Sequence, residues 1–273
     1  MAKMPDLYSI ASEVKSAQDD VRQIEPFASR WSDFDVGSAY RVARVVHDAR
    51  LAEGATPVGR KIGFTNHDMW SRYGVYEPIW AYVYENSVTY MSGGQGRCSL
   101  SRFAEPKIEP EIVFHLRSTP ASGSGLTALL ECIDWVANGL EVVQSHFPRW
   151  EFLAPDTIAD QALHGTLLVG EPQTIESLGS GVIEALSSFS IALSRDGKVR
   201  ENGRGANVLG SPLAALAHLI DVLSKQPESQ PLRANELITT GTLTRAHAVQ
   251  AADTWSTELN GIGIPGLRVA FTV

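Results

Sequence analysis

Two glutamates that could bind a metal ion, Glu109 and Glu111, stand two residues apart in the stretch EPKIEPEIVF. Side chains of a β-strand alternate between its two faces, so a strand here would place both carboxylates on one face. The opposite face would point toward a core and carry Ile108, Ile112 and Phe114. A third acid, Glu141, stands inside the apolar run WVANGLEVVQS, which is also typical of a strand.

The chemistry of these acids has two interpretations from the residues alone. A Glu-x-Glu pair is usually the solvated face of a strand. A glutamate inside an apolar run needs a partner, because a buried carboxylate without one is costly. Three converging carboxylates would repel one another unless a cation joined them, and ligands that are all oxygen select a hard ion such as Mg²⁺, Mn²⁺ or Ca²⁺.

The composition limits the class of protein that positions these acids. The chain has 273 residues, 44% apolar and 20% charged, as expected for one large globular domain or one domain with a small appendage. Its net charge of -8 argues against nucleic acid or an anionic membrane as a partner. No apolar run approaches the length of a membrane span, and the N-terminus lacks a signal-peptide pattern. Cys98 and Cys132 are too few for a disulfide framework, so we expect a cytoplasmic protein.

Apolar periodicity divides the chain into a helical region at 1–56 and a larger domain at 57–273. Two helical stripes occur in the first region, at Leu7, Ile10, Ala11 and Val14 and again at Ala39, Val42, Val45 and Val46. In the second region, short apolar runs bounded by glycines predict strands. We therefore predict an α+β fold with a mixed, curled β-sheet, outer helices and a helical N-terminal region packed on the main body.

Five later segments carry specific structural predictions. VIEALSSFSIALSRDGKVR predicts a strand that turns at Asp196 and Gly197 into a hairpin. GSPLAALAHLIDVLSK predicts an amphipathic helix, and GGQGR predicts a loop. ELITTGTLTRAHAV predicts a strand that reaches Gly241 and Thr242. GIGIPG matches a dinucleotide-binding pattern literally, but Pro265 interrupts it and too little chain follows for a helix, so we predict a β-turn between two strands.

Lys61 and His164 are the other candidates for chemistry. Lys61 lies in the strand-like run VGRKIGFT, where a lysine is usually at the surface because it is rarely buried without a partner. His164 lies in DTIADQALHGTLLVG and could be either a structural hydrogen-bonding residue or a proton carrier. Adjacent residues of a strand face opposite ways. His164 therefore reaches a functional site only if the chain is irregular at Leu163 or if the site lies on the face of the strand that carries His164.

Five blocks of the chain, taken in order, resemble the hydratase/decarboxylase branch of the fumarylacetoacetate hydrolase superfamily. The blocks span nearly the whole chain and read GRKIGFT, EPKIEPEIVF, GLEVVQS, DTIADQALHG and ELITTGTLT. That branch includes 2-hydroxypenta-2,4-dienoate hydratase and 4-oxalocrotonate decarboxylase. The resemblance implies a β-roll fold, a homo-oligomer, and a Mg²⁺ or Mn²⁺ ion held by Glu109, Glu111 and Glu141.

The resemblance also implies how a substrate is held beside that ion. Lys61 matches a family position that faces the acid group of the substrate, where a fixed ammonium would stabilise developing enolate charge. Gly241 and Thr242 match a pair that lines the site and hydrogen-bonds the substrate carboxylate.

Two positions depart from the family pattern. Ile79 follows a proline where hydratases often carry Asp, and Leu163 stands where they often carry Ser. Both acid–base positions are therefore apolar in this chain. His164 is the nearest titratable neighbour, and we predict that it supplies the acid–base function or positions the water that does.

Three classes of function follow from these residues. The first is a metal-dependent lyase that acts on a 2-oxo or 2-hydroxy-dienoic acid, as a hydratase of the 2-hydroxypenta-2,4-dienoate type in aromatic-compound degradation or as a 4-oxalocrotonate-type decarboxylase. The second is an acylpyruvate-type C–C hydrolase, which should carry a His–Glu pair on a mobile lid and which His47 and His67 keep open. The third is a binding protein that has lost its catalytic groups, which Ile79 and Leu163 keep open.

Overall fold

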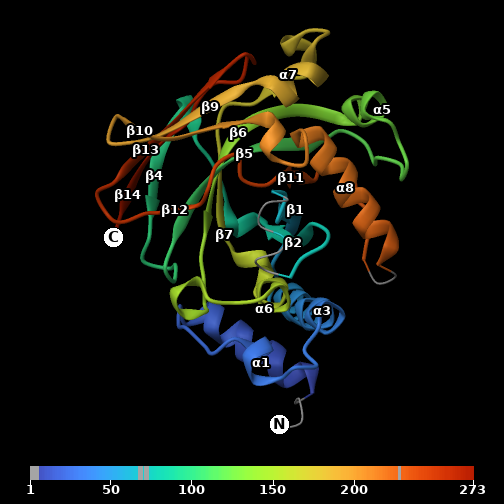
Figure 1. Cartoon of the computed structure of the whole chain (residues 1–273), viewed down its shortest axis with the longest axis vertical. Coiled ribbons are helices and arrows are strands. Elements are labelled where there is room, and N and C mark those ends of the chain that lie inside the picture. Colours follow the sequence, from blue (N-terminus) through green and yellow to red (C-terminus); the bar gives the residue numbers. More distant parts are fainter. Residues whose placement is uncertain (1–5, 67–69, 71–73, 227–228) are drawn as a thin grey trace.

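Two β-sheets form the body of the protein (Figure 1). The computed structural model describes residues 6–66, 70, 74–226 and 229–273. Within these ranges the larger sheet follows the order β2-β1-β11-β5-β6-β7-β3, with β12 paired to β5 and β8 paired to β6. Its strands are β1 (Pro57–Gly63), β2 (Ile79–Tyr84), β3 (Val88–Tyr90), β5 (Lys107–Leu116), β6 (Ile133–Val143), β7 (His164–Val169), β8 (Gln173–Thr174), β11 (Leu237–Thr239) and β12 (His247–Ala248).

The smaller sheet follows the order β10-β9-β13-β14-β4. Its strands are β4 (Gln95–Ser99), β9 (Ser190–Arg195), β10 (Lys198–Arg204), β13 (Thr254–Asn260) and β14 (Arg268–Thr272). The pairs β1–β11, β3–β7 and β4–β14 are parallel, whereas β5–β6 and β6–β7 are antiparallel. Apolar side chains of both sheets share one core, in which Leu140 and Val142 of β6 meet Trp255 and Phe271. The predicted α+β fold with a mixed, curled sheet is confirmed.

The N-terminal helices gather at one end of the molecule, below the sheets in Figure 1. Asp6 and Asp35 start two of them, because their carboxylates accept hydrogen bonds from the amides of Ser9 and Ser38 at 3.0 and 2.7 Å. The helices of the described chain are α1 (Leu7–Asp19), α2 (Phe27–Arg30), α3 (Val36–Ala52), α5 (Leu126–Glu131), α6 (Ala154–Ala159), α7 (Val182–Ser188) and α8 (Pro212–Lys225).

The apolar stripes of α1 and α3 pack against the segments that carry the candidate site. Val14 and Val42 are fully buried in one cluster together with Ile79, Ile158 and, less completely buried, Leu163. The helical region therefore shares its core with β2, α6 and the start of β7. The division of the chain at residue 56 remains a prediction.

Helix α8 packs on the face of β5 that is opposite to the face carrying Glu109 and Glu111. Leu213, Leu216 and Leu219 pack in a cluster that includes Ile112 and Phe114 of β5. The segment Gly205–Lys225 is also long and apolar enough to cross a membrane by length and composition, so the expectation that no run approaches a span is wrong. The burial of one α8 face in this cluster is what a core helix requires.

Three segments differ from their predicted form. Residues 182–188 form helix α7 instead of a strand, because Val182 and Leu186 are one helical turn apart and both are buried. Residues 95–97 belong to β4 instead of a loop, because they pair with β14. The predicted strand at 236–249 is interrupted between β11 and β12, so Gly241 and Thr242 lie in an irregular segment.

The hairpin turn forms as predicted, whereas the predicted β-turn at GIGIPG is a longer bent connection. Asp196 and Gly197 join β9 to β10 with φ values of 52° and 73°, and positive φ at both central residues is typical of a tight hairpin. The GIGIPG segment connects β13 to β14 and precedes no helix.

Candidate metal centre

Strands β5 and β6 bring the three predicted acids together. They pair in antiparallel register, with Glu109 directly opposite Glu141 and Glu111 opposite Gly139. One oxygen from each of the three carboxylates lies within 4.8 Å of the others. Glu111 and Glu141 are fully buried, and Glu109 is half-buried. The solvated-face interpretation of the Glu-x-Glu pair is therefore wrong.

Two of the carboxylate oxygens in this cluster have no hydrogen-bond partner among the residues that the structure describes. Glu111 Oε2 accepts a hydrogen bond from the Gly241 amide at 2.9 Å, but Glu111 Oε1 and Glu141 Oε2 are buried and accept none from the described chain. Buried polar atoms are almost always paired in folded proteins, because an unpaired one costs free energy. A divalent cation would supply the missing partner to both oxygens, and a donor set of three carboxylates suits Mg²⁺, Mn²⁺ or Ca²⁺.

Burial and mutual repulsion distribute charge unequally over the acids. Burial raises the pKa of Glu109 to about 7, against the attraction of Lys61 and with the repulsion of Glu141. Burial and the two neighbouring carboxylates raise the pKa of Glu111 as well. Burial would also raise the pKa of Glu141, but Lys61 and His164 lower it to about 2. Glu141 is therefore the acid of the three that ionises most readily, and a bound cation would favour ionisation of Glu109 and Glu111.

Lys61 supplies a fixed positive charge beside the acids. Its Nζ lies 3.2 Å from Glu141 Oε1 and donates a hydrogen bond to the Ala162 carbonyl at 2.9 Å. The side chain is 4% exposed, so the surface position that its residue type favours is wrong. Burial alone would lower the pKa of this ammonium, but Glu141, Glu109 and Glu111 together raise it, which keeps the group charged.

A strained turn before β7 presents two groups to the site. Gln161, Ala162 and Leu163 have φ values of 52°, 48° and 62°, in the left-handed region that residues with a side chain rarely adopt. The Leu163 amide donates to the Asp160 carbonyl at 2.8 Å, and the Leu163 carbonyl accepts from the Gln144 amide at 2.9 Å. The chain is therefore irregular at Leu163, with the Ala162 carbonyl directed at Lys61 and the His164 ring directed at Glu141.

His164 is held at both ring nitrogens. Nδ1 lies 2.7 Å from Glu141 Oε1, and Nε2 lies 2.8 Å from the Ser87 hydroxyl. Ser87 in turn donates to the Tyr84 carbonyl at 2.8 Å. No local pattern points to Ser87, because only the pairing of β3 with β7 brings it beside His164.

The Gly241–Thr242 segment is brought to the acids through its backbone. Gly241 has φ of 93°, and a Cβ at this position would overlap the side chain of Thr65, so only glycine fits. Its amide donates to Glu111. The Thr242 hydroxyl donates to the Thr244 carbonyl at 3.0 Å within its own turn, so its contact with a substrate carboxylate remains a prediction.

The two departures from the family pattern are buried apolar residues. Ile79 is 5% exposed and Leu163 is 8% exposed, and both belong to the cluster beneath the N-terminal helices. The His–Glu pair expected of a hydrolase is not found at His47, whose Nδ1 lies 2.8 Å from Tyr84 Oη. His67, the other candidate, lies outside the described residues.

Comparison with known proteins identifies the class to which this fold and site belong. The sequence pattern described as "Fumarylacetoacetate (FAA) hydrolase C-terminal" matches residues 75–270. The chain therefore belongs to the fumarylacetoacetate hydrolase family. A 2-keto-4-pentenoate hydratase of Burkholderia vietnamiensis is 30% identical to it over 97% of both chains.

One further relative and one solved structure are similar to this chain. A 4-oxalocrotonate decarboxylase of a Pseudomonas species is 29% identical over 84% of both chains. The solved 4-oxalocrotonate decarboxylase from Pseudomonas putida G7, complexed with magnesium and adipate, superimposes with a TM-score of 0.88 at 24% identity and covers 99% of this chain and 100% of that chain. The resemblance to the hydratase/decarboxylase branch is confirmed, and with it the assignment of the chain as a lyase.

Proposed function

We propose that this protein is a divalent-metal-dependent hydratase of the 2-hydroxypenta-2,4-dienoate type, acting in the degradation of aromatic compounds. The observation that carries the proposal is the buried cluster of Glu109, Glu111 and Glu141, with two unpartnered oxygens beside the Lys61 ammonium. The names of the similar hydratases supply the substrate class, a small 2-oxo or 2-hydroxy-dienoic acid. A homo-oligomer in the cytoplasm remains the expectation, and sedimentation of the purified protein would test the oligomer.

The three glutamates would hold one Mg²⁺, with Mn²⁺ as the alternative. When bound, such a cation neutralises negative charge on the oxygens of a 2-oxo acid and polarises its carbonyl group. The Gly241 amide keeps one oxygen of Glu111 in place at 2.9 Å. The other oxygen of Glu111 is left available to a cation.

Lys61 would orient the acid end of the substrate. Its ammonium is positioned in advance by Glu141 and the Ala162 carbonyl, so it needs no rearrangement when charge develops on the substrate. The contact with Ala162 depends on the left-handed turn at 161–163. The strain in this turn therefore serves the geometry of the site.

His164 stays a candidate for proton transfer, but its geometry favours a role in holding Glu141. Both ring nitrogens are occupied, by Glu141 and by Ser87. A histidine that hydrogen-bonds a ligating carboxylate orients that ligand and adjusts its affinity for the metal. The proton needed at the far carbon of a dienoate would then come from water or from the substrate itself.

The apolar residues at 79 and 163 favour a second candidate, a 4-oxalocrotonate-type decarboxylase. Loss of CO₂ needs no water to be activated at the far carbon, whereas hydration does. Buried Ile79 and Leu163 cannot activate water. A relative named as such a decarboxylase is 29% identical, close to the identity of the hydratases.

The products separate these reactions. The purified protein with Mg²⁺ is given 2-hydroxypenta-2,4-dienoate, 4-oxalocrotonate and an acylpyruvate, and each mixture is analysed by mass spectrometry. We expect the dienoate to gain one water, and EDTA to stop the reaction. Loss of CO₂ from 4-oxalocrotonate alone would establish the second candidate. Cleavage of the acylpyruvate into two acids would indicate a hydrolase, and turnover of none of the three would indicate a binding protein.

A further inference from the structure

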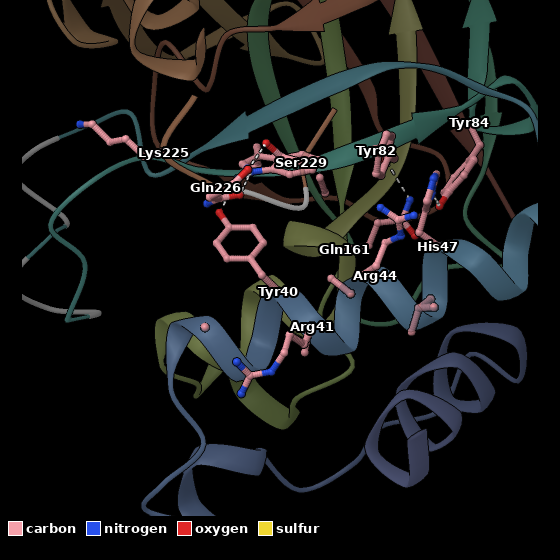
Figure 2. A pocket seen from close by; sticks show the side chains of 16 residues that line it. Tyr40, Arg41, Arg44, His47, Tyr82, Tyr84, Gln161, Lys225, Gln226 and Ser229 are labelled. Atoms are coloured by element: carbon pink, nitrogen blue, oxygen red, sulfur yellow. Dashed lines mark hydrogen bonds between the residues drawn. The ribbon is translucent and has the colours of Figure 1, made fainter. Parts of the chain in front are cut away.

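A cavity of about 320 Å³ lies at the free edge of the larger sheet, outside the metal centre. It is enclosed by α3, by β2 and by the end of α8, as Figure 2 shows. The described residues that line it include none of the three acids and neither Lys61 nor His164. Its volume is that of a small-molecule site, so it could hold one substituted ring.

Flat rings form the main wall of the cavity. Trp80, Tyr82 and Tyr84 alternate along β2 and therefore share one face of the strand. The His47 ring stacks on Tyr82 with centroids 3.7 Å apart and planes 8° apart, and Tyr40 stacks on Trp80 at 5.8 Å. The Arg60 guanidinium also lies over the Tyr82 ring, 4.0 Å from its centroid, so the wall offers edge contacts to a planar ligand.

Hydrogen bonds hold these walls in place without a ligand. His47 Nδ1 lies 2.8 Å from Tyr84 Oη, and Gln161 Nε2 donates to the Tyr82 carbonyl at 3.1 Å. Trp80 Nε1 donates to Gln226 Oε1 at 2.9 Å. A preformed aromatic cavity loses little entropy when it binds a ring, because its side chains are already ordered.

Arg44 gives the cavity a positive charge. Figure 2 shows its guanidinium beside His47 and Gln161, while Arg41 and Lys225 point away from them. Arg44 also pairs with Asp48 at 2.9 Å, but both side chains are about half exposed. An exposed pair of this kind contributes little free energy, so a ligand carboxylate can share the guanidinium with Asp48.

We propose that this cavity binds a small aromatic carboxylic acid, with its ring against the edges of Trp80 and Tyr82 and its carboxylate at Arg44. The aromatic wall selects a planar ring, and the guanidinium selects an acid over a neutral molecule of the same shape. The site is separate from the metal centre and does not depend on the reaction catalysed there.

The test is calorimetric titration of the full chain with benzoate after the metal has been removed by EDTA. We expect saturable binding at one site per chain. Arg44→Gln should weaken it about tenfold or more, as expected when a hydrogen bond to a charged group is lost. Benzyl alcohol, which has the ring but no charge, should bind the unmutated protein more weakly by a similar factor. Arg200→Gln, a matched change at an exposed arginine of β10, should leave benzoate affinity unchanged.

A second variant tests the cavity itself. Ala43 lines it from α3, and Ala43→Phe should fill it and abolish benzoate binding while circular dichroism shows an unchanged fold. If Ala43→Phe does not fold, Tyr82→Leu removes the stacking ring instead and should weaken binding. Three results would overturn the proposal. These are no saturable binding, binding that requires Mg²⁺, or an oligomer that binds no benzoate and that Ala43→Phe dissociates, since a second copy would then occupy the cavity.

Discussion

The metal centre and the edge cavity differ in how completely the protein satisfies its own polar groups. At the metal centre, Glu111 Oε1 and Glu141 Oε2 are buried without a protein partner. At the cavity, the polar atoms of His47, Trp80 and Gln161 are hydrogen-bonded within the wall. The first region therefore needs a cation to complete it, whereas the second is complete and would select a ligand by shape and by one charge.

The backbone is also more strained at the metal centre than at the cavity. The cavity is built mainly on the regular elements β2 and α3, although Gln161 of the left-handed turn also lines it, whereas the metal centre depends on the whole turn at 161–163 and on Gly241. Strained conformations persist only where the surrounding structure determines them. Substitutions at the metal centre should therefore have larger effects than substitutions at the cavity. The four predictions below concern the metal centre.

Replacing Glu111 by Gln should have the largest effect. The change removes one ligand charge from the cluster and leaves a side chain of the same shape, so we expect Mg²⁺-dependent turnover to fall to background and Mg²⁺ binding to be lost in calorimetry. The fold should survive, because a buried acid with a raised pKa is being replaced by a neutral group. Glu258→Gln, at an exposed position of β13, is the control. Full metal-dependent activity in Glu111→Gln would refute the proposed ligand set.

Replacing Lys61 by Ala should lower kcat by about a hundredfold, the cost of removing one preorganised donor from developing negative charge. The Michaelis constant should rise as well, because the same ammonium holds the acid end of the substrate. Steady-state kinetics at saturating Mg²⁺ measures both constants, with Lys198→Ala on β10 as the exposed control. A change in KM alone would mean that Lys61 binds the substrate but does not act on the transition state.

Replacing His164 by Ala should weaken Mg²⁺ binding by about 10–100-fold, the usual cost of removing a residue that orients a metal ligand. The physical reason is that Glu141 would lose its partner at 2.7 Å. Calorimetry measures the affinity, and incorporation of solvent deuterium into product measures proton transfer. His218→Ala, on the exposed face of α8, is the control. If Mg²⁺ affinity holds but deuterium incorporation stops, His164 carries the proton instead. If neither changes, the ring is structural and a decarboxylase becomes the better assignment.

The smallest effect should be a loss of stability of the metal-free protein as pH rises through about 7. Burial, despite Lys61, raises the pKa of Glu109 from its ordinary 4.5 to about 7, so the folded chain keeps a proton that the unfolded chain releases at lower pH. This stabilisation is fully present below pH 4.5 and disappears as pH rises through the folded value. Glu141, whose pKa is lowered, acts in the opposite direction but at lower pH.

Urea denaturation in EDTA measures this dependence. We expect the free energy of unfolding to fall by on the order of 2 kcal/mol between about pH 5 and 8. Saturating Mg²⁺ should remove the fall, because the cation replaces the proton. Glu109→Gln should make the fall smaller without any metal, while Glu111, whose pKa is also raised, continues to contribute to it. A curve that is the same for Glu109→Gln and the unmutated protein would show that Glu109 does not carry this dependence.

Several features of the site follow from local sequence alone. Period-two spacing put Glu109 and Glu111 on one face and Ile112 and Phe114 on the other, and the structure has them so. The helical stripes of α1 and α3 are predicted in the same way, because each pattern runs for several turns. The seven residues of α7 form a helix where the sequence predicts a strand, because a short apolar run does not distinguish the period of a helix from that of a strand.

Local residue order suffices to predict which side chains share a face of each strand, because that depends only on the geometry of neighbouring residues. Tertiary folding places Glu109 opposite Glu141 and brings Lys61 to the Ala162 carbonyl, a contact between residues 101 positions apart. It also decided that the chain before His164 turns left-handed, against the preference of its residues. Such a conformation is maintained by hydrogen bonds and packing from distant segments, and no local pattern encodes them.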